Sequence, residues 1–129
     1  MDHQDFEGRA SNGKTYARDF IDREGHGTHV AGTIIGLSVG VAKKAHVVSV
    51  KVINDAGKYA SSDFVAGIDW AVKHAQTHGG ASQAIINASL SFPKLKSVDE
   101  AVQSVRRAQM CFPMLMVFLL RLRLSPRGR

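Results

Sequence analysis

Two histidines three residues apart, His26 and His29, stand among glycines in the stretch DREGHGTHVAGTIIG at residues 22–36. An imidazole is the side chain best suited to take up and return a proton near neutral pH. Glycines on both sides of His26 would let another backbone approach it closely. The pattern predicts that His26 opens an amphipathic helix as a candidate general base. Surface or core histidines at a glycine-rich helix start would explain the same spacing.

A zinc site is a weaker interpretation of this pair. The stretch lacks the glutamate of a His-Glu-x-x-His helix, and two histidines three residues apart are a poor ligand signature on their own. His74 and His78 are four residues apart on a second predicted helix and could hold a metal. A solvated helix face explains that pair as well, so no metal ligand is assigned from the sequence.

Several predicted strands would form the sheet that positions the first helix. Residues 13–20 (GKTYARDF) alternate weakly and predict an edge strand, whereas residues 46–53 (HVVSVKVI) are typical of a strand covered on both faces. Residues 84–88 (AIINA) and 112–120 predict two more buried strands. Strands separated by helix-length segments predict parallel βαβ units with right-handed crossovers.

Two further helices are predicted between these strands. The first would begin at Ser61 or Ser62, where a hydroxyl can cap it, and end at Gly79. The second would begin with the capping box SVDE at residues 97–100. The predicted fold class is therefore α/β, a partial three-layer α/β/α arrangement around a parallel β-sheet. An unpaired edge of such a sheet would favour self-association.

Length, composition and charge limit the possible classes of protein. A chain of 129 residues with 44% hydrophobic and 22% charged residues suits one globular domain, and one cysteine excludes an internal disulfide. Six of the 17 Lys and Arg residues, and none of the 11 Asp and Glu residues, follow Val105, so the net charge of +6 belongs to the tail. The longest apolar run, residues 111–120, is about half of the roughly 20 residues that span a membrane. The polar start MDHQDFEGR predicts no signal peptide.

The run HGTHVAGT at residues 26–33 resembles the active-site histidine motif of the subtilisin-like serine proteases. The resemblance continues in order over about residues 3–108, and it is carried by HQDFEGRA at 3–10, GVAKKA at 40–45, VKV at 50–52 and GIDWA at 67–71. It is strongest to the proteinase K branch of fungal extracellular proteases. It implies a partial subtilisin-like peptidase domain over residues 1–108. Residues 109–129 would form a divergent, apolar and arginine-rich tail, a strand followed by disorder.

The resemblance implies roles for individual residues. His26 matches the catalytic histidine, which takes the proton of a serine and returns it to the leaving amine, and His29 matches a second, structural histidine. Two segments match the edges between which the family clamps an extended peptide by adding it as a strand. Such pairing reads the backbone, which implies a broad-specificity endopeptidase acting on peptides or proteins. The residues of the two segments are Gly57, Lys58, Tyr59, Ser89, Leu90 and Ser91.

Other parts of the family's site find no match in these residues. The resemblance places the catalytic aspartate before Met1, and it finds no counterpart of the Gly-Thr-Ser-Met-Ala serine motif or of the oxyanion-hole asparagine. In subtilisin itself, removing the serine costs on the order of 10⁶ in turnover. The chain alone is therefore expected to be inactive. Phe92 stands where the family has a glycine and would narrow the specificity pocket.

The arginine-rich end offers an alternative function. Beside an apolar run, it could make the chain a non-catalytic binding or regulatory module for anionic lipid or nucleic acid. Because no aromatic residue interleaves the last arginines as a stacking platform, no specific nucleic-acid partner is predicted. Calcium sites are common in the family, but no carboxylate cluster places one here, so no cofactor is predicted. The family implies an extracellular location, and the location of this chain stays unknown.

Overall fold

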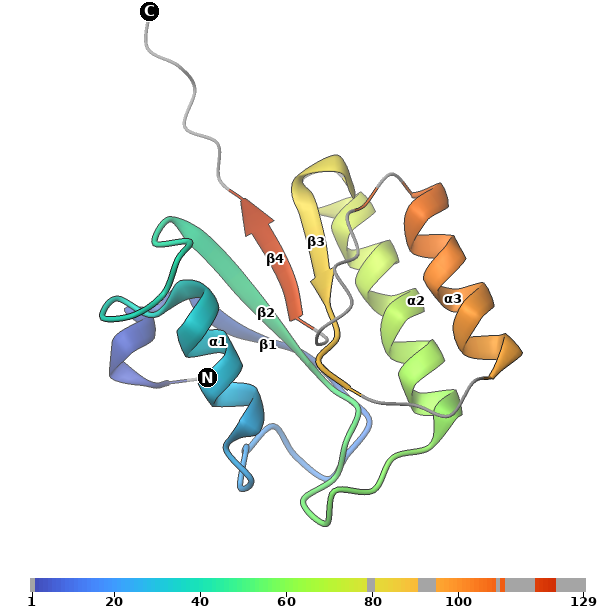
Figure 1. Cartoon of the computed structure of the whole chain (residues 1–129), viewed down its shortest axis with the longest axis horizontal. Helices are drawn as coiled ribbons and strands as arrows, with labels where there is room; N and C mark the ends of the chain where they lie inside the picture. The colour runs from blue at the N-terminus through green and yellow to red at the C-terminus, as the bar shows by residue number, and fades with distance from the viewer. Residues whose placement is uncertain (1, 79–80, 91–94, 109, 111–117, 123–129) are drawn as a thin grey trace, which may run out of the picture.

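The computed structural model describes residues 2–78, 81–90, 95–108, 110 and 118–122, which form helices on both sides of one sheet (Figure 1). The elements, in chain order, are the 3₁₀ turn η1 (Gln4–Phe6), β1 (Ala10–Thr15), α1 (His26–Ile35), β2 (Ala45–Lys51), α2 (Ser61–Thr77), η2 (Ala81–Gln83), β3 (Ala84–Asn87), α3 (Lys96–Arg107) and β4 (Phe118–Leu122). The predicted order of strands and helices up to residue 107 is therefore confirmed.

The four strands pair in the order β1-β2-β4-β3. β1 runs parallel to β2, with Ala10 opposite Val47. β4 lies between β2 and β3 and runs antiparallel to both. β2 and β3 consequently point in the same direction, as expected for a β-α-β unit joined through α2. The predicted edge strand is confirmed in its place, because β1 is the first strand of the sheet, but its predicted bounds of 13–20 are wrong, because β1 ends at Thr15.

The prediction of a third parallel strand over residues 112–120 is wrong in its direction, and its predicted start lies outside the described residues. The described part of the strand, β4, lies antiparallel to both of its neighbours, with Phe118 opposite both Ser49 and Asn87. An apolar run indicates burial, but it carries no information about direction, and either direction can satisfy the ladder hydrogen bonds. Residues 111–117 lie outside the described residues. The boundary predicted at residue 108 stays a prediction.

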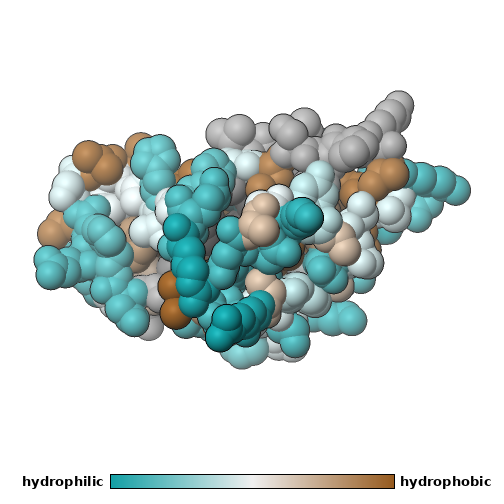
Figure 2. All heavy atoms as spheres, turned by 90° about the horizontal axis from the view of Figure 1, so that it is seen from below, coloured by the Kyte–Doolittle hydropathy of each residue, from teal (hydrophilic) through white to brown (hydrophobic). Residues whose placement is uncertain are grey.

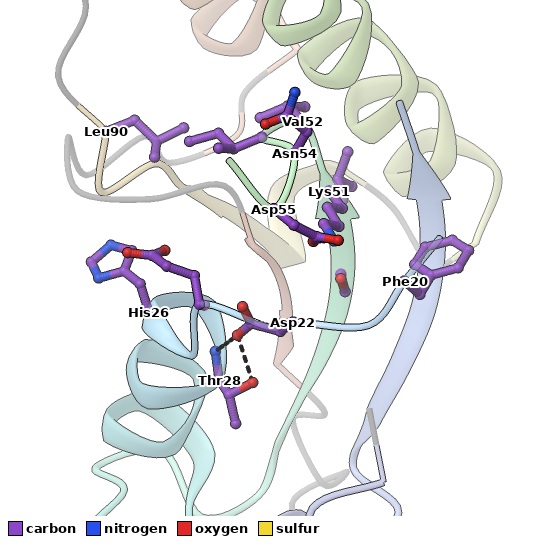
Figure 3. Close-up of a pocket in the computed structure, with 14 residues that line it drawn as sticks. Phe20, Asp22, His26, Thr28, Lys51, Val52, Asn54, Asp55 and Leu90 are labelled. Carbon is purple, nitrogen blue, oxygen red and sulfur yellow. Dashed lines mark hydrogen bonds and ion pairs between the residues drawn. The ribbon is translucent and has the colours of Figure 1, made fainter. Parts of the chain in front are cut away.

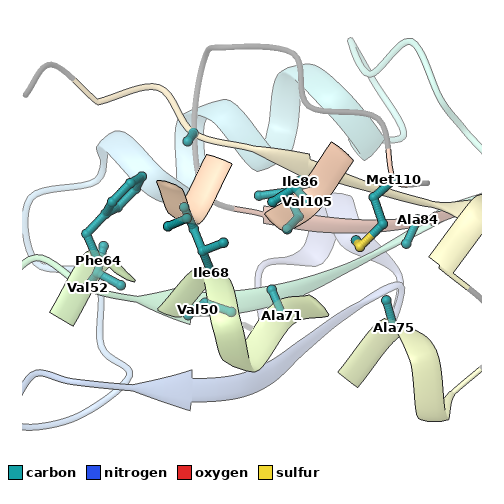
Figure 4. Packing of buried hydrophobic residues seen from close by; sticks show 12 residues of the cluster. Val50, Val52, Phe64, Ile68, Ala71, Ala75, Ala84, Ile86, Val105 and Met110 are labelled. Carbon is teal, nitrogen blue, oxygen red and sulfur yellow. The ribbon is translucent and has the colours of Figure 1, made fainter. Parts of the chain in front are cut away.

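Two apolar clusters hold the three layers together. The side chains of β2 alternate, so that Val47 faces α1 and Val50 faces α2. The smaller cluster lies between α1 and the sheet and consists of Phe6, Ala31, Ile35, Ala45 and Val47. The larger cluster joins α2 and α3 to the other face of the sheet, and its members include Val50, Val52, Phe64, Ile68, Ala71, Ala75, Ile86 and Val105 (Figure 4). The α/β/α layering is therefore confirmed.

α2 begins at Ser61, as predicted, but the caps of α2 and α3 differ from the predicted ones. α2 begins after Ala60 and α3 begins after Leu95, and neither residue makes a side-chain cap hydrogen bond. Because Leu95 is the cap of α3, Ser97 already lies inside the helix, and the predicted capping box does not form. Lys96 and Glu100 instead form an ion pair of 3.6 Å along the helix surface. The predicted end of α2 at Gly79 lies outside the described residues.

The surface is mostly hydrophilic on the face seen in Figure 2, where hydrophobic residues form small, separate areas. Across the described residues, Ile21, Leu37, Val39 and Val41 are the most exposed large apolar side chains. Within the same part of the chain, no helix has the length and apolar character needed to cross a membrane. The end of the arginine-rich tail, residues 123–129, lies outside the described residues. The alternative binding function and self-association through a sheet edge stay predictions.

Candidate active site

His26 is the first residue of α1, and the chain reaches it through a tight turn at Gly25. Gly25 has a φ of 83°, a left-handed conformation that strains residues with a side chain. The carboxylate of Asp22 folds back over this turn and accepts hydrogen bonds from the Gly25 amide at 2.9 Å and the Thr28 amide at 2.7 Å. It also accepts one from the Thr28 hydroxyl at 2.7 Å. Asp22 therefore satisfies two of the amides at the start of the helix that carries His26.

The ionisation of Asp22 follows from these contacts. Partial burial disfavours the carboxylate and would raise its pKa. The hydrogen bonds from the Thr28 hydroxyl, the Thr28 amide and the Gly25 amide outweigh that effect, and the pKa of Asp22 lies below its ordinary value of 3.8. The carboxylate of Asp22 is thus charged at neutral pH, and it interacts with the amides at the start of α1.

The far end of α1 is held by two cations. Arg9 donates from Nη1 to the Ile35 carbonyl at 2.6 Å, and Lys43 donates to the Gly36 carbonyl at 3.1 Å. Asp5 lies at this end as well, where it accepts hydrogen bonds from the Ser38 hydroxyl at 2.6 Å and the Ser38 amide at 3.0 Å. A helix of ten residues is about 15 Å long. Asp5 is therefore placed away from His26 and is not a partner for its ring.

The His26 side chain is exposed and borders a pocket together with Leu90, which follows β3 (Figure 3). Its Nε2 atom lies 3.4 Å from the carbonyl oxygen of Ser89, which is long for a hydrogen bond. The structure thus brings together three of the predicted site residues, His26, Ser89 and Leu90, from segments more than 60 positions apart. His29 is also exposed, in the following turn of α1.

Three of the other predicted substrate-binding residues lie apart from the pocket lining. Gly57, Lys58 and Tyr59 belong to the turn after β2, beyond Asn54 and Asp55, which do line the pocket. Asn54 closes this turn, because its Oδ1 atom accepts hydrogen bonds from the amides of Ala56 and Lys58, each at 3.0 Å. Gly57 has a φ of 70°. Its position in this turn therefore favours glycine.

Two predictions at the other edge fall outside what the structure covers. Ser91 and Phe92 lie outside the described residues, so the predicted role of Ser91 and the predicted narrowing by Phe92 are not tested. Across the described part of the chain, no group of three or more His, Cys, Asp or Glu side chains is arranged to hold a metal ion. The prediction that the chain needs no cofactor stays a prediction.

A network of ion pairs joins the loop before His26 to the turn after β2. Arg23 forms two 3.0 Å hydrogen bonds with the Asp19 carboxylate and one of 2.6 Å with Asp55. Lys51 continues the network, because it donates to Asp55 at 2.7 Å and to the Ile21 carbonyl at 2.6 Å. The hydrogen bond from Arg23 is the main reason that the pKa of Asp19 falls to about 2. The hydrogen bond from Lys51, followed by that from Arg23, lowers the pKa of Asp55.

One of the three acids that line the pocket, Glu24, differs from Asp22 and Asp55 in its interactions. Asp22 is bound to the helix start, and Asp55 is bound to Arg23 and Lys51. Glu24, two residues before His26, also lines the pocket. Among the described residues it has no hydrogen-bond or ion-pair partner. A cationic side chain entering beside His26 would therefore meet the Glu24 carboxylate.

Sequence reasoning missed Asp22, Arg23 and Glu24. An aspartate shortly before a helix start is a known capping signal, so the role of Asp22 was accessible from the sequence. Asp19 and Arg23 are four residues apart, but they lie in a loop, where helix spacing rules do not apply. Glu24 gives no signal in the sequence, because its role depends on which other acids are already paired.

Comparisons with known proteins identify a family and several relatives to which this chain is similar. A family model described as the subtilase family matches residues 2–118. The chain is 44% identical over 108 residues to Subtilisin-like protease 1 of Arthroderma otae, a match that covers 81% of this chain and 22% of that protein. It is also 44% identical over 103 residues to Subtilisin-like protease 1 of Trichophyton verrucosum, covering 78% of this chain and 26% of the relative. The chain thus spans about a quarter or less of these relatives.

A solved structure shares the fold. The crystal structure of a cold adapted subtilisin-like serine proteinase superposes with a TM-score of 0.77 at 35% sequence identity. The superposition covers 88% of this chain and 41% of that one. The sequence resemblance and the fold therefore agree over most of the described residues.

Proposed function

This chain belongs to the subtilase family, and we propose that it carries the histidine and part of the substrate cleft of a serine endopeptidase. The observation that carries the proposal is the position of His26. Its ring is exposed at the start of a helix held at both ends, and it borders a pocket shared with Leu90. A general base needs this combination of fixed direction and access to a reacting group.

The proposed chemistry is acyl transfer from a peptide bond. His26 takes the proton of a serine hydroxyl as that oxygen attacks the peptide carbonyl, and it then protonates the leaving amine. Asp22 and Arg23 do not take part in the proton transfer; they hold the start of α1 and the loop before it. The serine and the aspartate of the triad are supplied by residues other than those described here.

The proposed substrate is an extended peptide or protein segment. The segment pairs with the backbone around residues 57–59 and 89–91, and this main-chain recognition gives broad specificity. Glu24 adds a preference for a basic side chain in the pocket beside His26. An extracellular location is proposed from the resemblance to fungal extracellular proteases.

The sharpest test is a chimera in which residues 2–108 replace the matched segment of an active subtilisin-like protease. We expect the chimera to cleave a fluorogenic peptide. His26→Ala should then lower kcat on the order of 10⁶-fold, which is the effect known for subtilisin itself. Lys73→Gln, an exposed change on α2 outside the pocket lining, should leave kcat unchanged. A folded chimera whose activity survives His26→Ala would contradict the proposal.

The 129-residue chain provides the complementary measurement. With His26 but no match to the serine motif, it is expected to show no peptide turnover above buffer. Turnover that is blocked by a serine-protease inhibitor would contradict this expectation and would require a nucleophile within the chain.

A further inference from the structure

Three aromatic side chains form a ladder along one side of α2, and none of them belongs to the pocket lining. Trp70 and His74 stack with ring centroids 4.6 Å apart and an interplanar angle of 15°. His74 and His78 stack at 4.1 Å and 18°. Residues four apart lie on the same face of a helix, so the three rings follow one another along it. α2 covers the sheet face opposite α1, and the proposed peptidase site does not use this ladder (Figure 1).

Trp70 fixes the inner end of the ladder. Its Cη2 atom would lie 2.6 Å from a Cβ atom built on Gly13, so the indole packs directly against the backbone of β1. Trp70 and His74 are half-buried, while His78 is exposed. The ladder therefore runs outward from the β1 edge to solvent at the end of α2.

The hydrogen bonds of His78 determine which ring nitrogen is available to a ligand. Its Nδ1 atom lies 3.0 Å from the carbonyl oxygen of His74 and 2.7 Å from the hydroxyl of Thr77. That hydroxyl lies 3.0 Å from the Lys73 carbonyl and 3.1 Å from the His74 carbonyl, to which it can donate its own proton. A carbonyl only accepts, so we assign the ring proton of neutral His78 to Nδ1. The lone pair is then on Nε2.

This arrangement is typical of a metal-binding histidine. Such residues usually donate the second ring N–H to a carbonyl or carboxylate, which fixes the tautomer and the ring orientation. Here the carbonyl that orients His78 belongs to His74, the residue whose ring lies beside it. The two imidazoles are thus adjacent, and one of them is already oriented.

We propose that His74 and His78 form a two-histidine site for a divalent transition metal, with water completing the coordination. Imidazole ligands suit Cu²⁺, Ni²⁺ and Zn²⁺, and affinity at a given nitrogen site is highest for Cu²⁺. Hard cations such as Ca²⁺ and Mg²⁺ require oxygen ligands and should not compete. Because metal–nitrogen distances are about 2.0–2.1 Å, the two rings must tilt toward each other from their parallel stack. Metal binding should therefore also change the contact between His74 and Trp70.

The chain contains an internal probe for this site, because Trp70 is its single tryptophan. The full chain is titrated with CuCl₂ while tryptophan emission is recorded. All titrations use a His3→Gln background, so that the chain's amino-terminal region does not compete for the metal. We expect saturable quenching at one Cu²⁺ per chain, with weaker binding of NiCl₂ and ZnCl₂ and none of CaCl₂.

Matched variants distinguish the site from general histidine binding. His78→Gln should raise the apparent Kd for Cu²⁺ roughly tenfold or more. His74→Gln should do the same, with far-UV circular dichroism confirming that the helices persist. His29→Gln, an exposed histidine on α1, should leave the Kd unchanged. Equal effects of His29→Gln and His78→Gln, or quenching that never saturates, would overturn the proposal.

Electron paramagnetic resonance gives a second, independent readout. The Cu²⁺ spectrum should show coupling to two imidazole nitrogens, and His78→Gln should reduce this to one. A spectrum with a single nitrogen in the starting chain would show that His74 and His78 do not bind together.

Discussion

Asp22 and Thr28 are joined by two hydrogen bonds that end on one carboxylate oxygen, because the amide and the hydroxyl of Thr28 each lie 2.7 Å from Asp22 Oδ2. The same carboxylate binds the Gly25 amide through its other oxygen. His26 lies between these two anchored residues. The backbone position of His26 therefore depends on the hydrogen bonds of Asp22 to its neighbours.

Replacing Asp22 by alanine should loosen the start of α1. Loss of a capping acceptor costs about 0.5–2 kcal/mol of folding free energy. Urea denaturation should show this loss, and hydrogen exchange at the Gly25 and Thr28 amides should accelerate. Asp22→Asn keeps an oxygen acceptor and serves as the control, with a smaller loss. Equal protection of these amides in the alanine variant and the starting chain would contradict the capping role.

The stabilisation from Asp22 should also depend on pH. Its folded pKa lies below the unfolded value of about 3.8, so the folded state binds the proton less tightly than the unfolded state. The contribution is then fully present above the unfolded pKa, and it is lost as pH falls through the folded pKa. The difference in unfolding free energy between the starting chain and Asp22→Ala should shrink below about pH 4. A difference that stays constant down to pH 2 would exclude the charge as its source.

Arg23 should contribute to the stability of the fold, and this contribution should depend on salt concentration. Arg23→Gln removes the bridge between Asp19 and Asp55, and the destabilisation should be greatest at low ionic strength, because salt screens exposed charges. The pKa of Asp19 is about 2, so this contribution is present above pH 3.8 and is lost as pH falls toward 2. Thermal unfolding at several salt concentrations measures it. Arg18→Gln is the matched control, since Arg18 forms no ion pair among the described residues, and it should show a weaker dependence on salt.

Gly13 should resist substitution for steric reasons. A Cβ atom there would lie 2.6 Å from both Trp70 Cη2 and Val48 Cγ1, and 3.0 Å from the backbone oxygen of Ser49. Gly13→Ala should therefore destabilise the chain by about 1–3 kcal/mol, as overpacking does, and shift the emission of Trp70. Gly32→Ala, in open space within α1, should instead be neutral or stabilise by up to about 1 kcal/mol. Equal effects of the two changes in denaturant titrations would contradict the packing described here.

Much of the fold could be predicted from two features of the sequence, the spacing of its apolar residues and the histidine motif at residues 26–33. The apolar run before residue 53 locates β2, and the histidine motif locates the start of α1 at the residue where the helix begins. The predicted caps do not form at α2 and α3, whose N-cap residues are Ala60 and Leu95. The direction of β4 was inaccessible, since its pairing partners are distant in sequence.

Only the part of the site that belongs to a short sequence motif could be predicted from the sequence. His26 follows from a short run of residues, and its proximity to Ser89 follows from the resemblance to a whole family. The pairing of Arg23 with Asp55 spans 32 positions, and it depends on how a loop and a turn meet in space. Charge pairing of this kind has no period, so it appears only in the structure.

Glu24 should determine the charge preference of the pocket beside His26. It lines the pocket with Asp22, which accepts hydrogen bonds from Thr28, and with Asp55, which forms an ion pair with Arg23. The carboxylate of Glu24 is therefore the one that attracts a cationic group. An extended peptide with arginine should bind the chain more tightly than the same peptide with the neutral isostere citrulline, by about two- to fivefold, as for an exposed ion pair. Titration followed by NMR shifts of the Glu24 and His26 amides measures this ratio. Glu24→Gln should abolish the preference and Glu24→Lys should reverse it, while Glu7→Gln, which alters an acid paired with Arg9, should leave it unchanged. If the arginine peptide keeps its advantage in Glu24→Gln, another acid recognises the cation and the pocket's charge has been assigned to the wrong residue.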